Sequence, residues 1–360
     1  MKGKSTWSWG VLVGLALGIR IFAAFPAAVE RYYSQGVYPP VATGLRMLFG
    51  WIPFSIGDLL YGLAGAYLLY QFLLLVKKII TRMVSRPYLY GVIKNTVYWT
   101  LVTYIAFNLL WGLNYNRRGI AYQLQLQVAP YSTAELCSMV GLIVERMNAC
   151  DSTARLSRGA LASKKALFDF SSQAYDELNR QQGLFAYRVP SVKPSIFSYL
   201  GDYLGFTGYY NPFSGEAQVN TTVPVYVQPF TTCHEIGHQL GYAKENEANF
   251  AGFLSSRASP NPAFRYSVYF DLYTYAAREL YVRDSNLLKP FRSRLRPSIR
   301  RDYRELRDFY DRYQNPFEPV VRSLYGNYLK ANEQPQGIMS YNEVIAWLIA
   351  YWKKYGAAAI

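Results

Sequence analysis

The chain is organised around one short segment, which reads Thr231-Thr232-Cys233-His234-Glu235-Ile236-Gly237-His238-Gln239-Leu240-Gly241. Residues four apart share one face of an α-helix, so His234 and His238 can direct their imidazoles at a single metal ion, with Glu235 beside it. These two are the only histidines in the 360-residue sequence. Two histidines at this spacing, with a glutamate directly after the first, predict a zinc site on a helix.

A catalytic zinc ion binds three protein side chains and keeps one position open, so a third ligand is needed. Lys244 occupies the position at which the metzincins have their third histidine, and an ammonium group has no lone pair to donate. We expect Glu245 to be the third ligand, as in the Glu-x-x-x-Asp pattern of gluzincins, with Glu247 as the second choice. Asn249 follows Glu245 by one helical turn, so it can accept a hydrogen bond from a ligand imidazole.

Composition indicates that part of the chain lies in lipid. Hydrophobic residues make up 51% of the sequence and charged residues only 17%, below the roughly 25% of an average soluble chain. The net charge of +15 comes without any nucleic-acid motif, so anionic lipid headgroups are the expected counterpart. Three cysteines do not make a disulfide framework, and Cys233 is expected to pack in the core rather than bind the metal.

Three spans are expected in a transmembrane region at 1–118, at about residues 8–29, 59–76 and 95–115. A cleaved signal peptide remains an alternative for the first span. Pro39 and Pro40 indicate a loop, with a short helix at 41–51. Basic residues gather before the first span and between the second and third. The positive-inside rule therefore predicts a multi-pass protein of the cell membrane, with a cytoplasmic N-terminus and an extracytoplasmic C-terminal domain.

Residues 119–360 form the expected extracytoplasmic domain, which has no further apolar run of spanning length. Ser132 and Glu135 form a capping box that opens a helix to about residue 149, and a second helix is expected at 161–181. The β-branched residues of segment 216–227 predict a strand, and Pro224 makes it an edge strand. Such an edge can hold substrate as an added strand. The residues expected along it are Val219, Thr221, Val223 and Val225.

Longer stretches resemble an uncharacterised bacterial membrane-protein family, catalogued as a domain of unknown function. The resemblance lies in residues 111–115 (Trp-Gly-Leu-Asn-Tyr), 205–217, 233–250, 328–332 and 340–341. It implies three N-terminal transmembrane helices and an external zincin-like domain with a His-Glu-x-x-His motif, and it carries no established substrate. The expected fold class is therefore mainly α, a three-helix transmembrane bundle joined to an α+β zincin-like domain with a small sheet.

The site chemistry predicts a membrane-anchored zinc metallopeptidase acting on a peptide or protein at the outer face. Glu235 would take a proton from a water molecule whose pKa zinc lowers toward about 7. A tyrosine is the expected oxyanion donor because no histidine is left, and Tyr341 is our choice. The alternative is a non-catalytic envelope binding protein with a structural or vestigial metal site. Glu235 argues against this alternative, since a structural site does not need a base.

Overall fold

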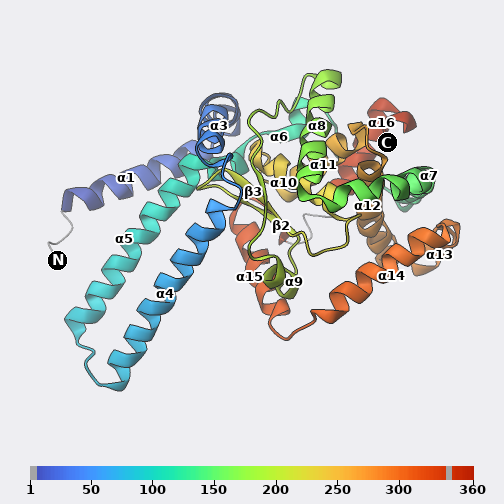
Figure 1. Ribbon diagram of the computed structural model, residues 1–360. Coiled ribbons are helices and arrows are strands. Elements are labelled where there is room, and N and C mark those ends of the chain that lie inside the picture. The colour runs from blue at the N-terminus through green and yellow to red at the C-terminus, as the bar shows by residue number, and fades with distance from the viewer. Residues whose placement is uncertain (1–5, 338–342) are drawn as a thin grey trace.

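The computed structural model describes residues 6–337 and 343–360 and is mainly helical, with one small three-stranded sheet (Figure 1). The N-terminal helices are α1 (Thr6–Ala23), α2 (Pro26–Ala28), the π-helix η1 (Val29–Val37), α3 (Tyr38–Phe49), α4 (Ile56–Ile80), α5 (Arg86–Leu110) and the 3-10 helix η2 (Gly112–Asn116). The later elements are α6 (Gly119–Gln123), α7 (Thr133–Ser157), η3 (Arg158–Ala162), α8 (Lys164–Gln182), β1 (Val192–Pro194), α9 (Ser198–Leu204), β2 (Gly208–Asn211), β3 (Glu216–Val219), α10 (Gln228–Gln239), α11 (Glu245–Ala258), α12 (Pro262–Arg283), α13 (Ser285–Arg294), α14 (Pro297–Arg312), α15 (Glu318–Ala331), α16 (Val344–Tyr355) and η5 (Ala357–Ala359).

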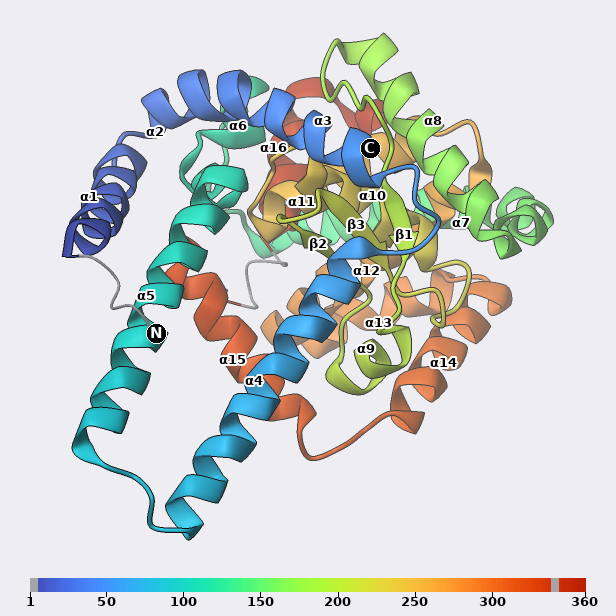
Figure 2. The same cartoon turned by 60° about the vertical axis from the view of Figure 1, so that its left-hand side comes forward.

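Helices α1, α4 and α5 lie where the three spans are expected, and they project from one side of the rest of the molecule (Figures 1 and 2). Within the described residues, α1 and α4 are long and apolar enough to cross a membrane. Helix α1 packs along α5, where the rings of Trp9 and Tyr98 are 5.5 Å apart. Helix α4 stands apart from α5 along its length (Figure 2).

The segment after α1 differs from the expectation in two ways. Helix α1 ends at Ala23, six residues before the predicted end of the first span, and the chain restarts at Pro26 as α2 and then η1. Pro39 and Pro40 do not form a loop, because they lie in the first turn of α3. Helix α3 follows η1 without a break, since the Tyr38 N–H bonds back to the Tyr33 carbonyl oxygen, and the two prolines only leave out backbone donors at this junction.

The predicted edge strand at 216–227 is wrong. Only residues 216–219 form a strand, β3, and it is the central strand, parallel to β1 and antiparallel to β2. The strand stops because Asn220 Oδ1 accepts the backbone N–H of Thr222 at 2.9 Å, which turns the chain away from the sheet. Val219 therefore belongs to the sheet, whereas residues 221–227, including Thr221, Val223 and Val225, form a turn that leads into α10.

The helical signals of the C-terminal part are confirmed. The capping box of Ser132 and Glu135 opens α7, which continues to Ser157 rather than to 149. Helix α8 ends with Gly183 in the left-handed conformation. The second helix of the predicted metal hairpin, α11, is enclosed by α8, α10, α12 and α16, and α7 packs along α12.

Segments on the N-terminal side of residue 118 cap the end of α10. The last carbonyl groups of a helix have no partner within it. Tyr38 Oη donates to the Gln239 carbonyl oxygen at 2.8 Å, and Trp111 Nε1 donates to that of His238 at 3.0 Å. Arg117 Nη1 donates to the Gly241 carbonyl oxygen at 3.0 Å. Helix α10 is therefore bonded directly to α3 and to the end of α5.

Arg117 is itself fixed by a buried ion pair with Glu30 of η1. Two parallel bonds join them, from Nη2 to Oε1 at 2.8 Å and from Nε to Oε2 at 3.0 Å. Burial alone would raise the pKa of Glu30, but the hydrogen bond and charge of Arg117 outweigh it and lower the pKa from 4.5 to about 2. The pair ties η1 to the turn after α10.

Replacing Glu30 with Gln should lower the free energy of unfolding by about 3–5 kcal/mol, because the Arg117 guanidinium would stay buried without its counter-charge. The pKa of Glu30 is lower in the folded state, so the stability it contributes is present above pH 4.5 and is lost as the pH falls toward about 2. Denaturant titration in detergent micelles measures both effects. The matched control is Arg31→Gln, which removes an exposed charge from the same helix. Equal losses in the two variants would contradict the assignment.

Candidate metal centre

Helices α10 and α11 form a tight hairpin that brings Glu245 back onto the two histidines. Gly241 makes the turn with φ of 84°, and a Cβ there would lie 2.8 Å from the Tyr38 ring. Gly237 and Gly252 let the helices approach closely, since a Cβ on Gly237 would lie 3.3 Å from Ala251 Cβ and one on Gly252 3.2 Å from His234 N. The six residues between His238 and Glu245 are therefore enough to bring Glu245 back to the two histidines.

The three predicted ligands converge at one buried point. Glu245 Oε2 lies 3.2 Å from His234 Nε2 and 3.6 Å from His238 Nε2. Tetrahedral zinc with bonds of about 2.0–2.1 Å separates its ligand atoms by about 3.3 Å, so these spacings fit. His234, His238 and Glu245 are 7%, 6% and 3% exposed. Two imidazole nitrogens and one carboxylate oxygen also form a donor set that catalytic zinc uses.

Each imidazole is oriented through its second nitrogen. His234 Nδ1 lies 2.8 Å from Asn249 Oδ1, as expected from the sequence, and His238 Nδ1 lies 2.8 Å from the backbone oxygen of Tyr242. Both partners are acceptors, so each Nδ1 is placed to carry the proton, and Nε2 is the atom of the neutral ring that could bind a metal. These contacts fix the tautomer and the ring direction that a metal ligand requires.

Glu235 lies next to the ligands with one carboxylate oxygen unpaired. Its Oε2 is buried and makes no hydrogen bond within the described part of the chain. Gly208 of β2 forms the opposite wall, where a Cβ would lie 2.5 Å from Glu235 Oε1. A buried carboxylate oxygen normally has a partner, and a cation or a polar ligand at the centre would provide one for Glu235 Oε2.

The charges of the site favour a positive ion between the carboxylates. Burial raises the pKa of Glu235 to about 7, although both histidines oppose the change. Burial would lower the pKa of His238, but Glu245 outweighs it and raises that pKa to about 9. Burial would raise the pKa of Glu245, yet the two imidazoles hold it well below its usual range. A divalent cation between the carboxylates would offset the same negative charge that favours protonation of His238.

Other predicted residues lie away from the ligands. The Glu247 carboxylate lies against Gly119 of α6, where a Cβ would meet its Oε1 at 1.7 Å. Cys233 is fully buried, and burial raises the pKa of its thiol to about 11, so it stays protonated and packs in the core as expected. Tyr341, the predicted oxyanion donor, lies outside the described residues.

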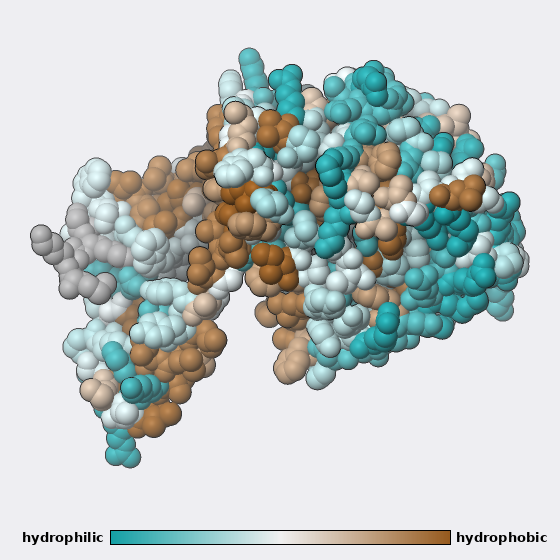
Figure 3. Space-filling model, in the orientation of Figure 1, coloured by the Kyte–Doolittle hydropathy of each residue, from teal (hydrophilic) through white to brown (hydrophobic). Residues whose placement is uncertain are grey.

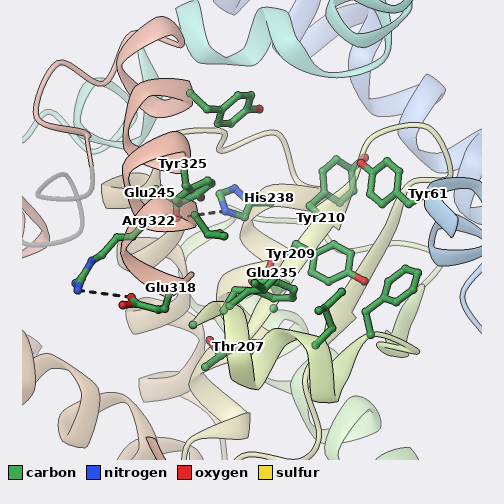
Figure 4. Close-up of a pocket in the computed structure, with 18 of the residues that line it drawn as sticks. Tyr61, Thr207, Tyr209, Tyr210, Glu235, His238, Glu245, Glu318, Arg322 and Tyr325 are labelled. Carbon is green, nitrogen blue, oxygen red and sulfur yellow. Dashed lines mark hydrogen bonds and ion pairs between the residues drawn. The ribbon is translucent and has the colours of Figure 1, made fainter. Parts of the chain in front are cut away.

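Sequence reasoning missed two residues of the site. Tyr325 of α15 points toward Glu245 and His238 (Figure 4), and its Oη donates to Glu245 Oε1 at 2.7 Å. The three predicted ligands line one cavity, and Asp271 of α12 lines it too. Burial raises the pKa of the Asp271 carboxyl group to about 6. Tyr325 lies 80 residues after Glu245 in a chain with 34 tyrosines, so no local pattern identifies it.

The chain belongs to a family described as protein of unknown function (DUF3810), whose model matches residues 33–349. This finding confirms the resemblance to an uncharacterised family. The match includes the hairpin of α10 and α11, the helices α3, α4 and α5, and the first half of α16. No curated protein and no solved structure matches the chain.

The hairpin predicts that the purified protein binds one zinc ion per chain through His234, His238 and Glu245. Removing one of three ligands should weaken zinc binding at least about 100-fold, since a loss in the outer shell alone costs 10–100-fold. Metal analysis after dialysis against a zinc buffer compares wild type with His234→Ala and Glu245→Ala. Glu247→Gln is the control on the same helix and should keep its zinc. Loss of zinc from Glu247→Gln but not from Glu245→Ala would reverse the ligand assignment.

Proposed function

We propose that this protein is a membrane-anchored zinc metallopeptidase that hydrolyses peptide bonds at the outer face of the membrane. The observation that carries the proposal is the meeting of His234, His238 and Glu245 in one buried site, with an unpaired oxygen of Glu235 beside them. A structural metal site has no use for that fourth group, whereas a hydrolase needs a base there. A metal helix, a third ligand on the following helix and a small sheet support a zincin-like domain of the gluzincin type.

The exposed apolar helices support a membrane anchor. Within the most apolar 18-residue window of α4, no residue is buried by the rest of the protein. A core helix of a soluble protein would be mostly buried, so lipid is the medium that suits this surface. Figure 3 shows large hydrophobic areas on the projecting helices, interspersed with paler surface, and a hydrophilic far tip. The tip carries Lys77, Lys78, Arg82 and Arg86.

These charges support the orientation. By the positive-inside rule the basic tip is cytoplasmic, and the metal centre at the opposite ends of α4 and α5 is then extracytoplasmic. In this arrangement α1, α4 and α5 are the three spans of a multi-pass protein.

The residues around the centre suit hydrolysis. Zinc, when bound by the three ligands, supplies a Lewis acid that lowers the pKa of water to about 7. The Glu235 carboxylate is placed to accept a proton from the attacking water and to pass it to the leaving amine. Its side chain is buried and its Oε2 makes no hydrogen bond within the described residues, so the carboxylate is available to take and return that proton. Gly208 leaves room at Glu235, because any larger residue would collide with the carboxylate.

The open edge of β2 is the proposed substrate strand, in place of the predicted edge at 219–225. The Thr207 carbonyl oxygen accepts the Asn220 N–H at 2.8 Å, so Thr207 faces β3. In an antiparallel pair the hydrogen-bonding direction alternates, which turns the backbone groups of Gly208 and Tyr210 away from β3. A peptide laid along this edge would pass directly beside Glu235.

Replacing Glu235 with Gln should reduce peptide hydrolysis by about 10²–10⁴-fold while zinc stays bound, because only the proton acceptor is lost. A randomised decapeptide library incubated with the purified, zinc-loaded protein reports cleavage by mass spectrometry. Glu145→Gln, which changes an exposed glutamate, is the control and should cleave as wild type does. Hydrolysis undiminished in Glu235→Gln would contradict the role of Glu235. If zinc-loaded wild type cleaves no peptide, the binding-protein alternative is favoured.

A further inference from the structure

The metal centre opens into a cavity that continues between the projecting helices. This cavity has a volume of ≈ 2110 Å³ and includes His234, Glu235, His238 and Glu245. Its walls extend along α4 and α5 well beyond the centre, as far as Gln71 and Val92. Helix α15 forms a further wall through Tyr325 and Tyr328. In Figure 4, Tyr61 of α4 and Tyr210 of β2 lie on the side of the cavity opposite Tyr325.

The metal centre lies at the end of the membrane helices. Trp111 follows the last residue of α5, its Nε1 donates to the His238 carbonyl oxygen at 3.0 Å, and its ring lies 5.9 Å from the His238 ring. Glu216 of β3 accepts the Gly57 N–H in the first turn of α4 at 2.7 Å. The N-terminal end of α4 and the C-terminal end of α5 are thus both fixed next to the site. A bond cleaved there would lie within a few residues of the membrane surface.

Polar side chains line the cavity at membrane depth. Those from α5 are Asn95, Thr96, Thr100 and Thr103, and Gln71 adds an amide from α4. In a bilayer such groups face a partner or a cavity rather than lipid tails. An acyl chain offers them no hydrogen bonds, whereas amide and hydroxyl groups commonly hold one transmembrane helix against another.

The mouth of the cavity is bordered by exposed apolar residues. Helices α9 and α15 lie in contact, and each exposes large hydrophobic side chains. These are Tyr199, Leu200 and Tyr203 of α9, Phe317 directly before α15, and Val320 and Leu324 of α15. Figure 3 shows hydrophobic surface on the side of the domain that faces the projecting helices. This border suits contact with the outer leaflet, so a substrate can reach the centre without leaving the membrane.

We propose that the substrate is a membrane-embedded polypeptide whose transmembrane helix enters between α4 and α5, and that the bond cleaved lies just outside the bilayer. The proposal rests on the proposed function and specifies its substrate class. An α-helix is about 10–12 Å across, which suits a cavity that has both α4 and α5 as walls better than a single acyl chain does.

Photo-crosslinking in lipid nanodiscs tests this route independently of turnover. The Glu235→Gln protein carries p-benzoylphenylalanine in place of Thr100, which lines the cavity, or of Leu109, which is also exposed on α5 but does not line it. Position 109 is nine residues from position 100, so it lies on the opposite face of the helix. Three probes share one randomised decapeptide, which is fused to an apolar helix of about 20 residues, acylated with palmitate, or left free. We expect the helix-fused probe to give about tenfold more adduct at position 100 than at position 109.

Equal adduct at the two positions would overturn the proposal, and so would adduct formed at position 100 by the palmitoylated probe but not by the helix-fused one. Hydrolysis of the same probes by wild type separates this inference from the proposed function. Adduct at position 100 without hydrolysis supports the route and rejects the peptidase. Free decapeptides cleaved as fast as helix-fused ones, with no preferred adduct, support the peptidase and reject the route.

Discussion

The hydrogen bonds at the carbonyl end of α10 are the constraint on which the rest of the structure depends. The residues that cap this end, Tyr38, Trp111 and Arg117, all precede the expected domain boundary at 118. Bonds to buried carbonyl groups hold position more firmly than contacts between exposed surfaces would, because breaking them leaves unpaired polar groups. Helix α10 is therefore held at a fixed place against α3 and the end of α5, and the boundary at 118 remains a prediction from composition.

The hairpin of α10 and α11 can be short because the two helices pack closely. Glycines at positions 237, 241 and 252 remove the side chains that would keep α10 and α11 apart, so a third ligand close in sequence can reach the centre. Burial then does two things. It leaves Glu235 Oε2 without a hydrogen-bond partner among the described residues, and it raises the pKa of the Glu235 carboxyl group to about 7.

Local patterns predicted what is decided locally. The spacing of four residues predicted that His234 and His238 face the same point. The position of Asn249, one turn after Glu245, predicted its contact with a histidine ring. Both predictions depend only on helical geometry. The strand at 216–227 failed since Asn220 ends it through a side-chain bond that composition does not reveal. No local pattern predicts the positions of Tyr325 and Asp271 or the capping of α10. In each case the residues that meet come from segments far apart in the sequence. Pro39 was read as a loop signal, although proline equally suits the start of a helix.

X-ray absorption at the zinc edge of the purified protein tests the central claim most directly, because it reports the ligand atoms themselves. We predict a first shell of nitrogen and oxygen at about 2.0–2.1 Å, with outer-shell scattering from two imidazoles. Sulfur scattering at about 2.3 Å would instead place Cys233 on the metal. That result, or scattering from fewer than two imidazoles, would contradict a centre built from His234, His238 and Glu245.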